Sequence, residues 1–331
     1  MTDLVSTIDS GGGGDYTTWQ AWEDACSSDL VADGNNWIGE QIDEEITTST
    51  TTTISGITTD ATNRLIMRCT TGSSFVDNAT PGTDPLRYDI TKGAAVRRTT
   101  NYGSVFDQVN VRVEVSQLQF KSDLSSVVWT CSTSTQPLFA DQCIFDGKSG
   151  SNQLVVYRNS GDRSKLTNCV IVSDGDNGEG ILGRDYDARF CTFYCTATTP
   201  GSVVAGSYGV GDFDNCLFLN FADWQTSTQV HLVDYCVTDV SSWESSTAAN
   251  SVLNATVSDE IKSDSGVRTT CDLSAKAGGS SDGGGSPVSG VTIDIYGQTR
   301  DGSTPTVGAF EIVSAGPAGT AGRMALLGMG I

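Results

Sequence analysis

Two short acidic stretches contain residues that could hydrolyse a glycosidic bond. Asp185 and Asp187 each lie 27 residues before a second aspartate, Asp212 and Asp214. Glycoside hydrolysis needs two carboxyl groups roughly 5 to 9.5 Å apart, and neighbouring turns of a coiled chain could supply them. However, acidic residues outnumber basic ones by 40 to 19, so such pairs also arise by chance. We therefore favour the alternative, that these are turn aspartates that accept backbone hydrogen bonds.

Other catalytic chemistries have weaker signals. Arg184 and Arg189 flank the first aspartate pair and could supply the base of a lyase, beside a carboxylate-bound Ca²⁺. The stretch 174–179 superficially suggests calcium, but Gly178 occupies a position where an EF-hand loop needs Asp or Asn. His231 stands between two apolar residues in a predicted strand, which is typical of a structural or surface histidine rather than a general base. The sequence thus predicts no catalytic residue, cofactor or metal site.

A cysteine repeat indicates the architecture that positions these residues. Five similar segments, such as Asp-Gln-Cys-Ile-Phe and Asp-Asn-Cys-Leu-Phe, align on Cys143, Cys169, Cys191, Cys216 and Cys236. The cysteines are 26, 22, 25 and 20 residues apart, and Leu118 fits the same frame one step earlier. An irregular period in the low twenties, without helical stretches between, predicts a coil that winds once per repeat.

Alternation along each segment predicts the inner face of the coil. Residues two apart on a strand point the same way, so Cys143 and Phe145 should share one face, as should Cys216 and Phe218. Stacked turn on turn, they predict a buried column of cysteines beside a column of large apolar residues. Small buried thiols behave as hydrophobes. We therefore expect free thiols rather than the disulfide framework that is the alternative.

The residues between these positions should point outward, yet they are apolar. The outward column consists of Ile144, Val170, Val172, Tyr194, Leu217, Leu219 and Val237. A stripe this apolar is not expected to face water. We predict that identical columns cover it around a threefold axis; a long loop of the same chain is the alternative.

Three regions follow one another along the chain. Residues 1–46 are predicted to form an N-terminal cap, with a helix over residues 15–26, a capping box of Thr17 and Gln20, and two tryptophans on one face. Residues 47–312 should form the coil, beginning with strands over 47–54 and 65–69. Residues 313–331 should form an extended arm.

Composition excludes several classes of function. The net charge is −21, which disfavours nucleic-acid binding because phosphate backbones are repelled. Neither a secretory signal nor a long apolar run for a membrane span is visible. The cysteines lack CxxC pairs, and with a single histidine, His231, there is no zinc pattern. We expect synthesis in a reducing host cytoplasm. The chain could still reach the outside as part of a particle.

Motifs at both ends resemble those of a known class. Gly-Gly-Asp15-Tyr-Thr-Thr-Trp is similar to the opening motif, and Asp294-x-x-Gly297-x-x-Arg300 with Gly-Ala-Phe-Glu311 to the closing motif, of right-handed parallel β-helix proteins such as pectate lyases and many phage tailspikes. The resemblance spans residues 11 to 311 and implies an all-β, single-stranded, right-handed parallel β-helix. Arg300 could pair with Asp294 or Glu311 and seal the last turn; three solvated surface charges are the alternative.

The same resemblance carries the functional expectation, although this fold hosts unrelated functions. The Trp-rich cap and small-residue tail are similar to phage- and prophage-encoded proteins. This implies a structural protein of the virion surface, a capsid decoration protein or a spike, with the major capsid protein and a homotrimer as partners. The alternative is a carbohydrate-binding or depolymerising tailspike, a polysaccharide lyase or glycoside hydrolase that recognises a host surface glycan. A host adhesin is a third, weaker option.

The C-terminal arm differs in composition from the rest of the chain. It has no acidic residue and one basic residue, Arg323. Its apolar residues are Met324, Leu326, Leu327, Met329 and Ile331. We expect these side chains, together with the outward column at Ile144, Val170 and Leu217, to bind partners. The alternative is a disordered tail.

Overall fold

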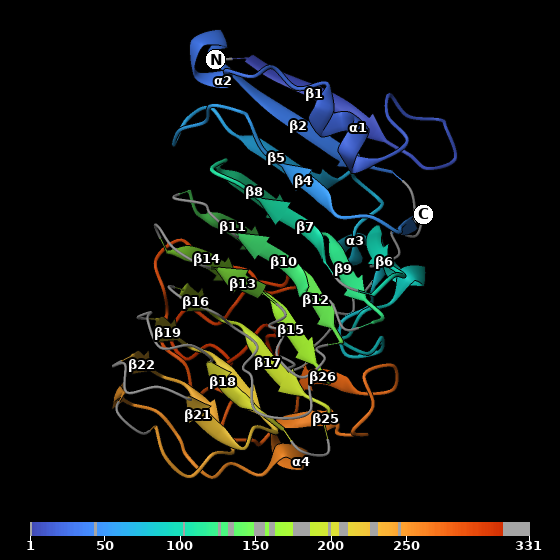
Figure 1. Cartoon of the computed structure of the whole chain (residues 1–331). Helices are drawn as coiled ribbons and strands as arrows, with labels where there is room; N and C mark the ends of the chain where they lie inside the picture. Colours follow the sequence, from blue (N-terminus) through green and yellow to red (C-terminus); the bar gives the residue numbers. More distant parts are fainter. Residues whose placement is uncertain are drawn as a thin grey trace, which may run out of the picture.

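The computed structural model describes residues 2–42, 45–101, 103–124, 127–131, 136–148, 156–158, 163–174, 186–197, 200–204, 211–225, 231–243 and 246–313. The chain is an all-β protein in which successive strands wind into stacked parallel sheets, a parallel β-helix (Figure 1). The predicted fold class is confirmed.

The longest side of the coil is a ten-stranded parallel sheet, here called sheet A. Its strands in spatial order are β1 (Thr2–Ile8), β2 (Asn35–Gln41), β5 (Leu65–Cys69), β8 (Val113–Ser116), β11 (Leu138–Asp141), β14 (Ser164–Thr167), β16 (Tyr186–Arg189), β19 (Asp212–Asp214), β22 (Leu232–Asp234) and β24 (Thr247–Ala249). Its middle strands alternate buried with partly exposed residues, as in β8 and β11. This alternation is typical of a sheet with one solvated face.

The second side, sheet B, has eight strands. They are β3 (Glu45–Thr48), β6 (Ala95–Arg98), β9 (Gln119–Ser122), β12 (Ile144–Gly147), β15 (Val170–Ser173), β17 (Thr192–Cys195), β20 (Leu217–Leu219) and β23 (Val237–Thr238). Every residue of β12, β15, β17 and β20 is buried. In the turns of the coil that contain these four strands, both faces of the sheet are therefore covered.

The third side, sheet C, is formed by shorter strands. They are β4 (Thr52–Ile54), β7 (Ser104–Gln108), β10 (Val127–Cys131) and β13 (Val156–Arg158), followed by the pair β18 (Ser202–Val204) and β21 (Asp223–Gln225). The predicted strand over 65–69 is present as β5. The strand predicted over 47–54 is wrong as one element, because the chain turns between β3 and β4 and passes from one sheet to another.

A sharp turn joins sheet A to sheet B in each repeat. In this turn, the residue directly before the cysteine has a positive φ. The angle is 50° at Asn168, 50° at Phe190 and 55° at Asn215. Asparagine tolerates this left-handed conformation well, whereas a bulky aromatic residue adopts it rarely. The turn sets the register of each repeat, so the strand after it points its cysteine into the coil.

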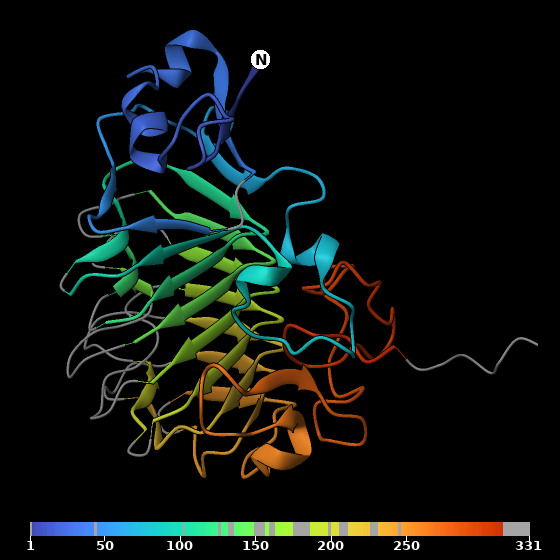
Figure 2. The same cartoon turned by 90° about the vertical axis from the view of Figure 1, so that its right-hand side faces the viewer.

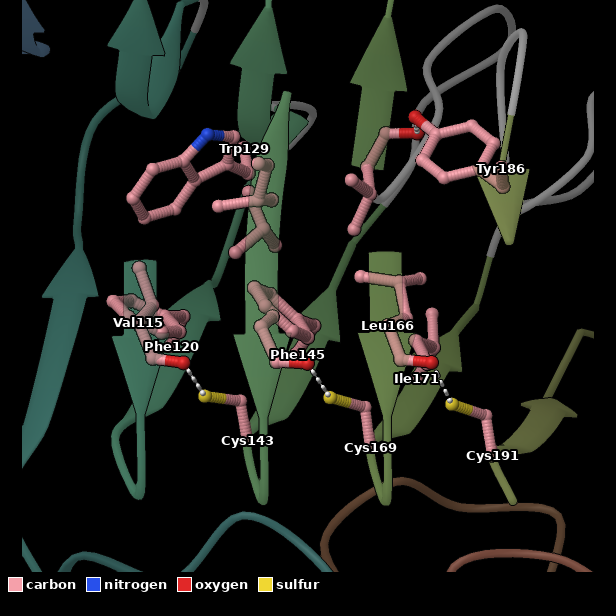
Figure 3. Close-up of a cluster of buried hydrophobic side chains, with 14 of the residues drawn as sticks. Val115, Phe120, Trp129, Cys143, Phe145, Leu166, Cys169, Ile171, Tyr186 and Cys191 are labelled. Carbon is pink, nitrogen blue, oxygen red and sulfur yellow. Dashed lines mark hydrogen bonds between the residues drawn. The ribbon is translucent and has the colours of Figure 1, made fainter. Parts of the chain in front are cut away.

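The interior holds the predicted cysteine column. Cys143, Cys169, Cys191 and Cys216 are completely buried and unpaired. Each thiol donates a hydrogen bond to a carbonyl of the preceding turn, as Cys191 does to the Leu166 oxygen at 3.4 Å (Figure 3). The expected burial of these cysteines is confirmed, and the structure contains them as free thiols.

A helical cap covers the N-terminal end of the coil. The helix α1 (Trp19–Asp24) is followed by α2 (Leu30–Asp33), and Trp19 and Trp22 are buried against the core. The capping box predicted at Thr17 is wrong by one residue, because Thr18 is the N-cap and its hydroxyl accepts from the Ala21 N–H at 3.1 Å. No capping box forms in this frame, because the third residue after the N-cap is Ala21, whose side chain cannot bond back to Thr18.

The coil occupies a different part of the chain from the predicted 47–312. Its sheet A begins with β1 and β2, which were assigned to the cap, and ends at β24. Residues 257–313 then run back along the outside of the coil, and we call them the covering segment (Figure 2). Its regular elements are α4 (Val257–Glu260), β25 (Ile261–Ser263) and β26 (Asp272–Ala275).

The covering segment buries the outward apolar column of sheet B. Ile144, Val170 and Leu217 are at most 1% exposed and form a second apolar cluster with residues such as Ile295 and Phe310. The loop over residues 70–94, with α3 (Phe75–Asn78) and the short 3₁₀ helix η1 (Ile90–Lys92), completes this cover. The prediction that a neighbouring subunit binds this column is therefore wrong. Its alternative, cover by the same chain, is what the structure contains.

Candidate functional site

The structure places two of the nominated carboxylates next to each other on sheet A. Asp187 of β16 lies directly opposite Asp212 of β19 in the parallel register. One guanidinium joins them, because Arg163 donates to Asp187 Oδ1 at 3.0 Å and also contacts Asp212 Oδ2. Burial opposes the charge of Arg163, but its bonds to the two carboxylates outweigh this and raise its pKa. The pair is thus held as an ionic bridge between strands.

The 27-residue spacing paired the aspartates wrongly. It aligned Asp185 with Asp212 and Asp187 with Asp214, whereas the structure pairs Asp187 with Asp212, which is 25 residues later. Cys191 and Cys216 are also 25 residues apart and mark this turn of the coil. The cysteine frame therefore contained the correct register. Asp185 itself lies outside the described residues.

Asp214 has a different environment from the bridged pair. In the parallel register it lies between Arg189 and Asp234. Burial, and then the neighbouring carboxylate of Asp234, raise the pKa of Asp214 to about 6, whereas Arg189 acts in the opposite direction. Its Oδ1 accepts a hydrogen bond from the amide of Asn215 at 2.6 Å. A carboxyl group with a raised pKa is a feature of acid–base sites, but the hydrogen bond that this one accepts comes from the side chain of the adjacent turn residue, Asn215.

His231 is a buried residue of the coil wall. It is 2% exposed, and its Nδ1 accepts a hydrogen bond from the Gly211 N–H at 2.9 Å. Burial lowers its pKa to about 4, with Asp212 acting in the opposite direction, so the imidazole is neutral at pH 7. Since Nδ1 is the acceptor, the proton lies on Nε2. The residue packs against the rings of Phe213 and Trp224.

The closing motif forms a buried polar junction. Arg300 is 6% exposed and donates to Glu311 Oε2 at 3.3 Å, and it also bonds three carbonyl oxygens of residues 306–309. Its guanidinium reaches the coil, where it bonds Asn168 Oδ1 at 2.9 Å and stacks 4.0 Å from the centre of the Phe190 ring. Burial lowers the pKa of Arg300 to about 10, so it stays charged at neutral pH. The pairing partner is Glu311.

Asp294 contributes to the same junction without contacting Arg300 directly. Its carboxylate accepts from the backbone N–H groups of Tyr296, Gln298 and Glu311 at 2.8 to 2.9 Å, and burial raises its pKa. Gly297 provides the turn between them with a φ of 75°. The predicted role of sealing the last turn of the coil is wrong, because this junction binds the covering segment to the middle turns of the coil.

Further polar contacts of the covering segment were not predicted. The turn residues before the cysteines supply several, as Gln142 donates to the Asp294 oxygen at 2.7 Å and Asn215 bonds Ser286. Arg268 bridges the buried Asp146 and Asp174, the latter at 3.3 Å. In the sequence, the available signal for these turns was the asparagine or glutamine directly before several of the cysteines. The partners of Arg268 are 94 or more residues away, and nothing local in the sequence joins them.

A groove crosses the outer face of sheet A. It has a volume of about 480 Å³ and runs between the outer face of β8, β11, β14 and β16 and the loop 289–291. Phe139, Lys165 and Arg189 line it together with Glu114 and other residues. In the part of the chain that the structure describes, Lys165 and Arg189 have no carboxylate partner at ion-pair distance, whereas Arg163, on the same side, is bridged. No motif or spacing in the sequence indicated this groove.

The remaining candidates are placed as follows. Arg184 and the apolar arm residues Met324, Leu326, Leu327, Met329 and Ile331 lie outside the described residues. Within the described ranges, no group of three or more His, Cys, Asp or Glu side chains could hold a metal ion, and no helix is long and apolar enough to cross a membrane. The sequence matches no known protein family and no curated protein.

Proposed function

We propose that this chain is a structural, surface-exposed component of a virion, either a capsid decoration protein or a spike, attached through its C-terminal residues 314–331. The observation that carries the structural part is the bridge from Arg163 to both Asp187 and Asp212. Both carboxylates are paired with Arg163 and connect strands of the coil. They are therefore not available as the acid and base of a hydrolase. The virion setting rests on the similarity of the Trp-rich cap, the Thr-rich first strands and the small-residue C-terminal tail to phage- and prophage-encoded proteins.

Two further properties support a role in display. The net charge of −21 keeps copies apart and soluble when many are held close together. The outer face of sheet B is closed by the covering segment of the same chain, so a single copy buries its apolar surface. A unit whose apolar face is closed in this way can be placed at many positions of a particle.

A quantitative mass census of purified particles tests this proposal. Particles are collected from the host that encodes the chain, washed at high salt, and its copies counted against the major capsid protein. Hundreds of copies support capsid decoration, and a handful supports a spike. Finding the protein only in the soluble fraction would reject a virion role.

A second function is favoured by the groove on sheet A. Its unbridged cations Lys165 and Arg189 beside hydroxyl groups such as that of Thr167 could hold a host surface glycan. This is the tailspike alternative, in which the chain binds or cuts a polysaccharide as a lyase or a hydrolase.

Incubation with native host polysaccharides distinguishes the two functions. The structural proposal predicts no release of reducing ends or unsaturated sugars, and no change in binding when Lys165 is replaced by Ala. Saccharide release that disappears in Asp187→Asn or Asp212→Asn would establish the enzyme instead. Retention of polysaccharide that is lost in Lys165→Ala and Arg189→Ala, but not in the control Lys276→Ala, would establish a binding role.

A further inference from the structure

A second, mainly apolar cavity lies beside the junction of the closing motif. It has a volume of about 280 Å³ and is lined by Phe190 of the coil and by the covering segment, including Val288, Val291, Arg300 and Pro305. The polar head group of Arg300 is engaged by Glu311, Asn168 and backbone carbonyls. The charge of Arg300 is therefore already paired, and the apolar lining residues offer an apolar ligand a surface.

The described chain ends close to this cavity. The carboxylate of Glu311 accepts from the backbone N–H of Asp301, a lining residue, at 3.2 Å, and from the guanidinium of Arg300. The last described residue, Val313, follows two positions later and is 59% exposed. Two residues span at most about 7 Å of extended chain, so residues 314–331 begin near the cavity.

The sequence of residues 314–331 fits such a cavity. Residues 314–323 are rich in Gly, Ala and Pro, and they can span up to about 35 Å. They are followed by Met324, Leu326, Leu327, Met329 and Ile331. Arg323 stands just before these residues and is complementary to Asp301, an exposed carboxylate at the cavity. A segment tethered this close has a high effective concentration at the site.

We propose that one or two of the apolar side chains of the chain's own C-terminal segment, 324–331, occupy this cavity while the protein is free. This inference rests on the proposed function, in which the same side chains attach the protein to the particle. They cannot contact the cavity and the particle at once. Docking within the chain thus keeps them out of water before attachment, and attachment releases them.

Hydrogen exchange of the full-length protein, read by mass spectrometry, tests this contact. Amides of residues 324–331 should exchange at least about tenfold more slowly than in an unstructured peptide, since burial of one or two large apolar side chains shifts an equilibrium by that factor or more. Val288→Asp in the cavity should abolish this protection, whereas the neighbouring Ser289→Asp should not. The reciprocal variant Leu326→Asp should speed exchange at residues 287–305 without altering the coil.

Three results would overturn the proposal. Residues 324–331 could exchange at the rate of an unstructured peptide in the unaltered protein. Their protection could persist in Val288→Asp with the coil intact. It could also depend on protein concentration, which would mean that the segment docks on a second copy. Particle attachment is measured separately with the chain lacking residues 314–331: its loss without any docking rejects this inference alone, and full attachment rejects the proposed role of the segment.

Discussion

The outer faces of sheets A and B are built on the same coil but have opposite character. Strands of sheet A alternate buried and exposed residues, and their outer face carries ionic bridges such as that of Arg163. Strands of sheet B are buried at every position in the lower turns, and their outer face is covered by residues 70–94 and 257–313. The interior is continuous behind both. A strand with apolar residues on both faces thus requires other residues to bury its outer face. These residues can come from a distant part of the same chain.

The largest expected effect comes from comparing two arginines, one for each face. Arg300→Met should lower the free energy of unfolding by about 3 to 5 kcal/mol, because it leaves Glu311 buried without its partner. Arg163→Met on sheet A should cost at most about 1 kcal/mol, since its side chain is 36% exposed. Urea unfolding followed by fluorescence measures both. Equal losses would mean that the two faces do not differ in burial as described.

A pair of leucines separates the faces by packing alone. Leu217→Ala on the covered face of sheet B should cost about 2 to 5 kcal/mol, because the side chain is 1% exposed and leaves a cavity. Leu232→Ala on sheet A, where the side chain is 53% exposed, should change stability by less than about 0.5 kcal/mol. The same unfolding experiment applies. A small effect at Leu217 would show that the covering segment is not packed against the coil.

Two titratable groups next to the last strands of sheet A, His231 and Asp214, should change the stability of the fold with pH in opposite directions. The folded pKa of His231, about 4, is lower than its ordinary value near 6.5, so its contribution to stability is complete above pH 6.5 and is lost as the pH falls towards 4. The folded pKa of Asp214, about 6, is raised, so its contribution has the opposite sign and is lost as the pH rises from about 4 to 6. His231→Gln should therefore reduce the loss of stability on acidification, and Asp214→Asn should reduce the loss on going from pH 4 to 6. Thermal unfolding at pH 4, 5, 6 and 7 measures both, and unchanged slopes in the two variants would contradict the assigned burial.

Among the buried side chains, the smallest effect is expected at the cysteine column. Cys169 and Cys191 donate only thiol hydrogen bonds to carbonyls of the preceding turn, and such bonds are weak. Cys191→Ala should cost about 1 to 2 kcal/mol, chiefly from lost packing, and the folded protein should not react with a thiol reagent at its buried cysteines. Nine of the ten cysteines are buried and only Cys26 is partly exposed, so rapid labelling of more than one thiol in the native protein would contradict this burial.

The coil and its inner columns could be predicted from sequence because their signals are local and repeated. The cysteine frame fixed which residues face inward, and its 25-residue step at Cys216 even contained the correct pairing of Asp187 with Asp212. The cover of sheet B could not be predicted in the same way. Its contacts join residues such as Asp146 and Arg268, which are 122 apart in sequence, and a residue pattern states that a face is covered without stating by what.

The role of the closing motif shows the same limit. The pairing of Arg300 with Glu311 could be predicted from residue types, and the structure contains it. Its position could not, because the bond from Arg300 to Asn168 crosses 132 residues and brings the motif to the middle of the coil instead of its end. Local chemistry thus identified the partners, and only the packing of the covering segment located the junction.

The most direct test of the proposed structural role is the occupancy of particles by the full-length protein and by the chain that lacks residues 314–331. Both proteins are added in excess to particles stripped of the native protein, and bound copies are counted by quantitative mass spectrometry. The account predicts that both fold, with the same circular dichroism and unfolding midpoint, and that only the full-length chain restores the native copy number. Equal occupancy by the two proteins, or binding of neither, would contradict it.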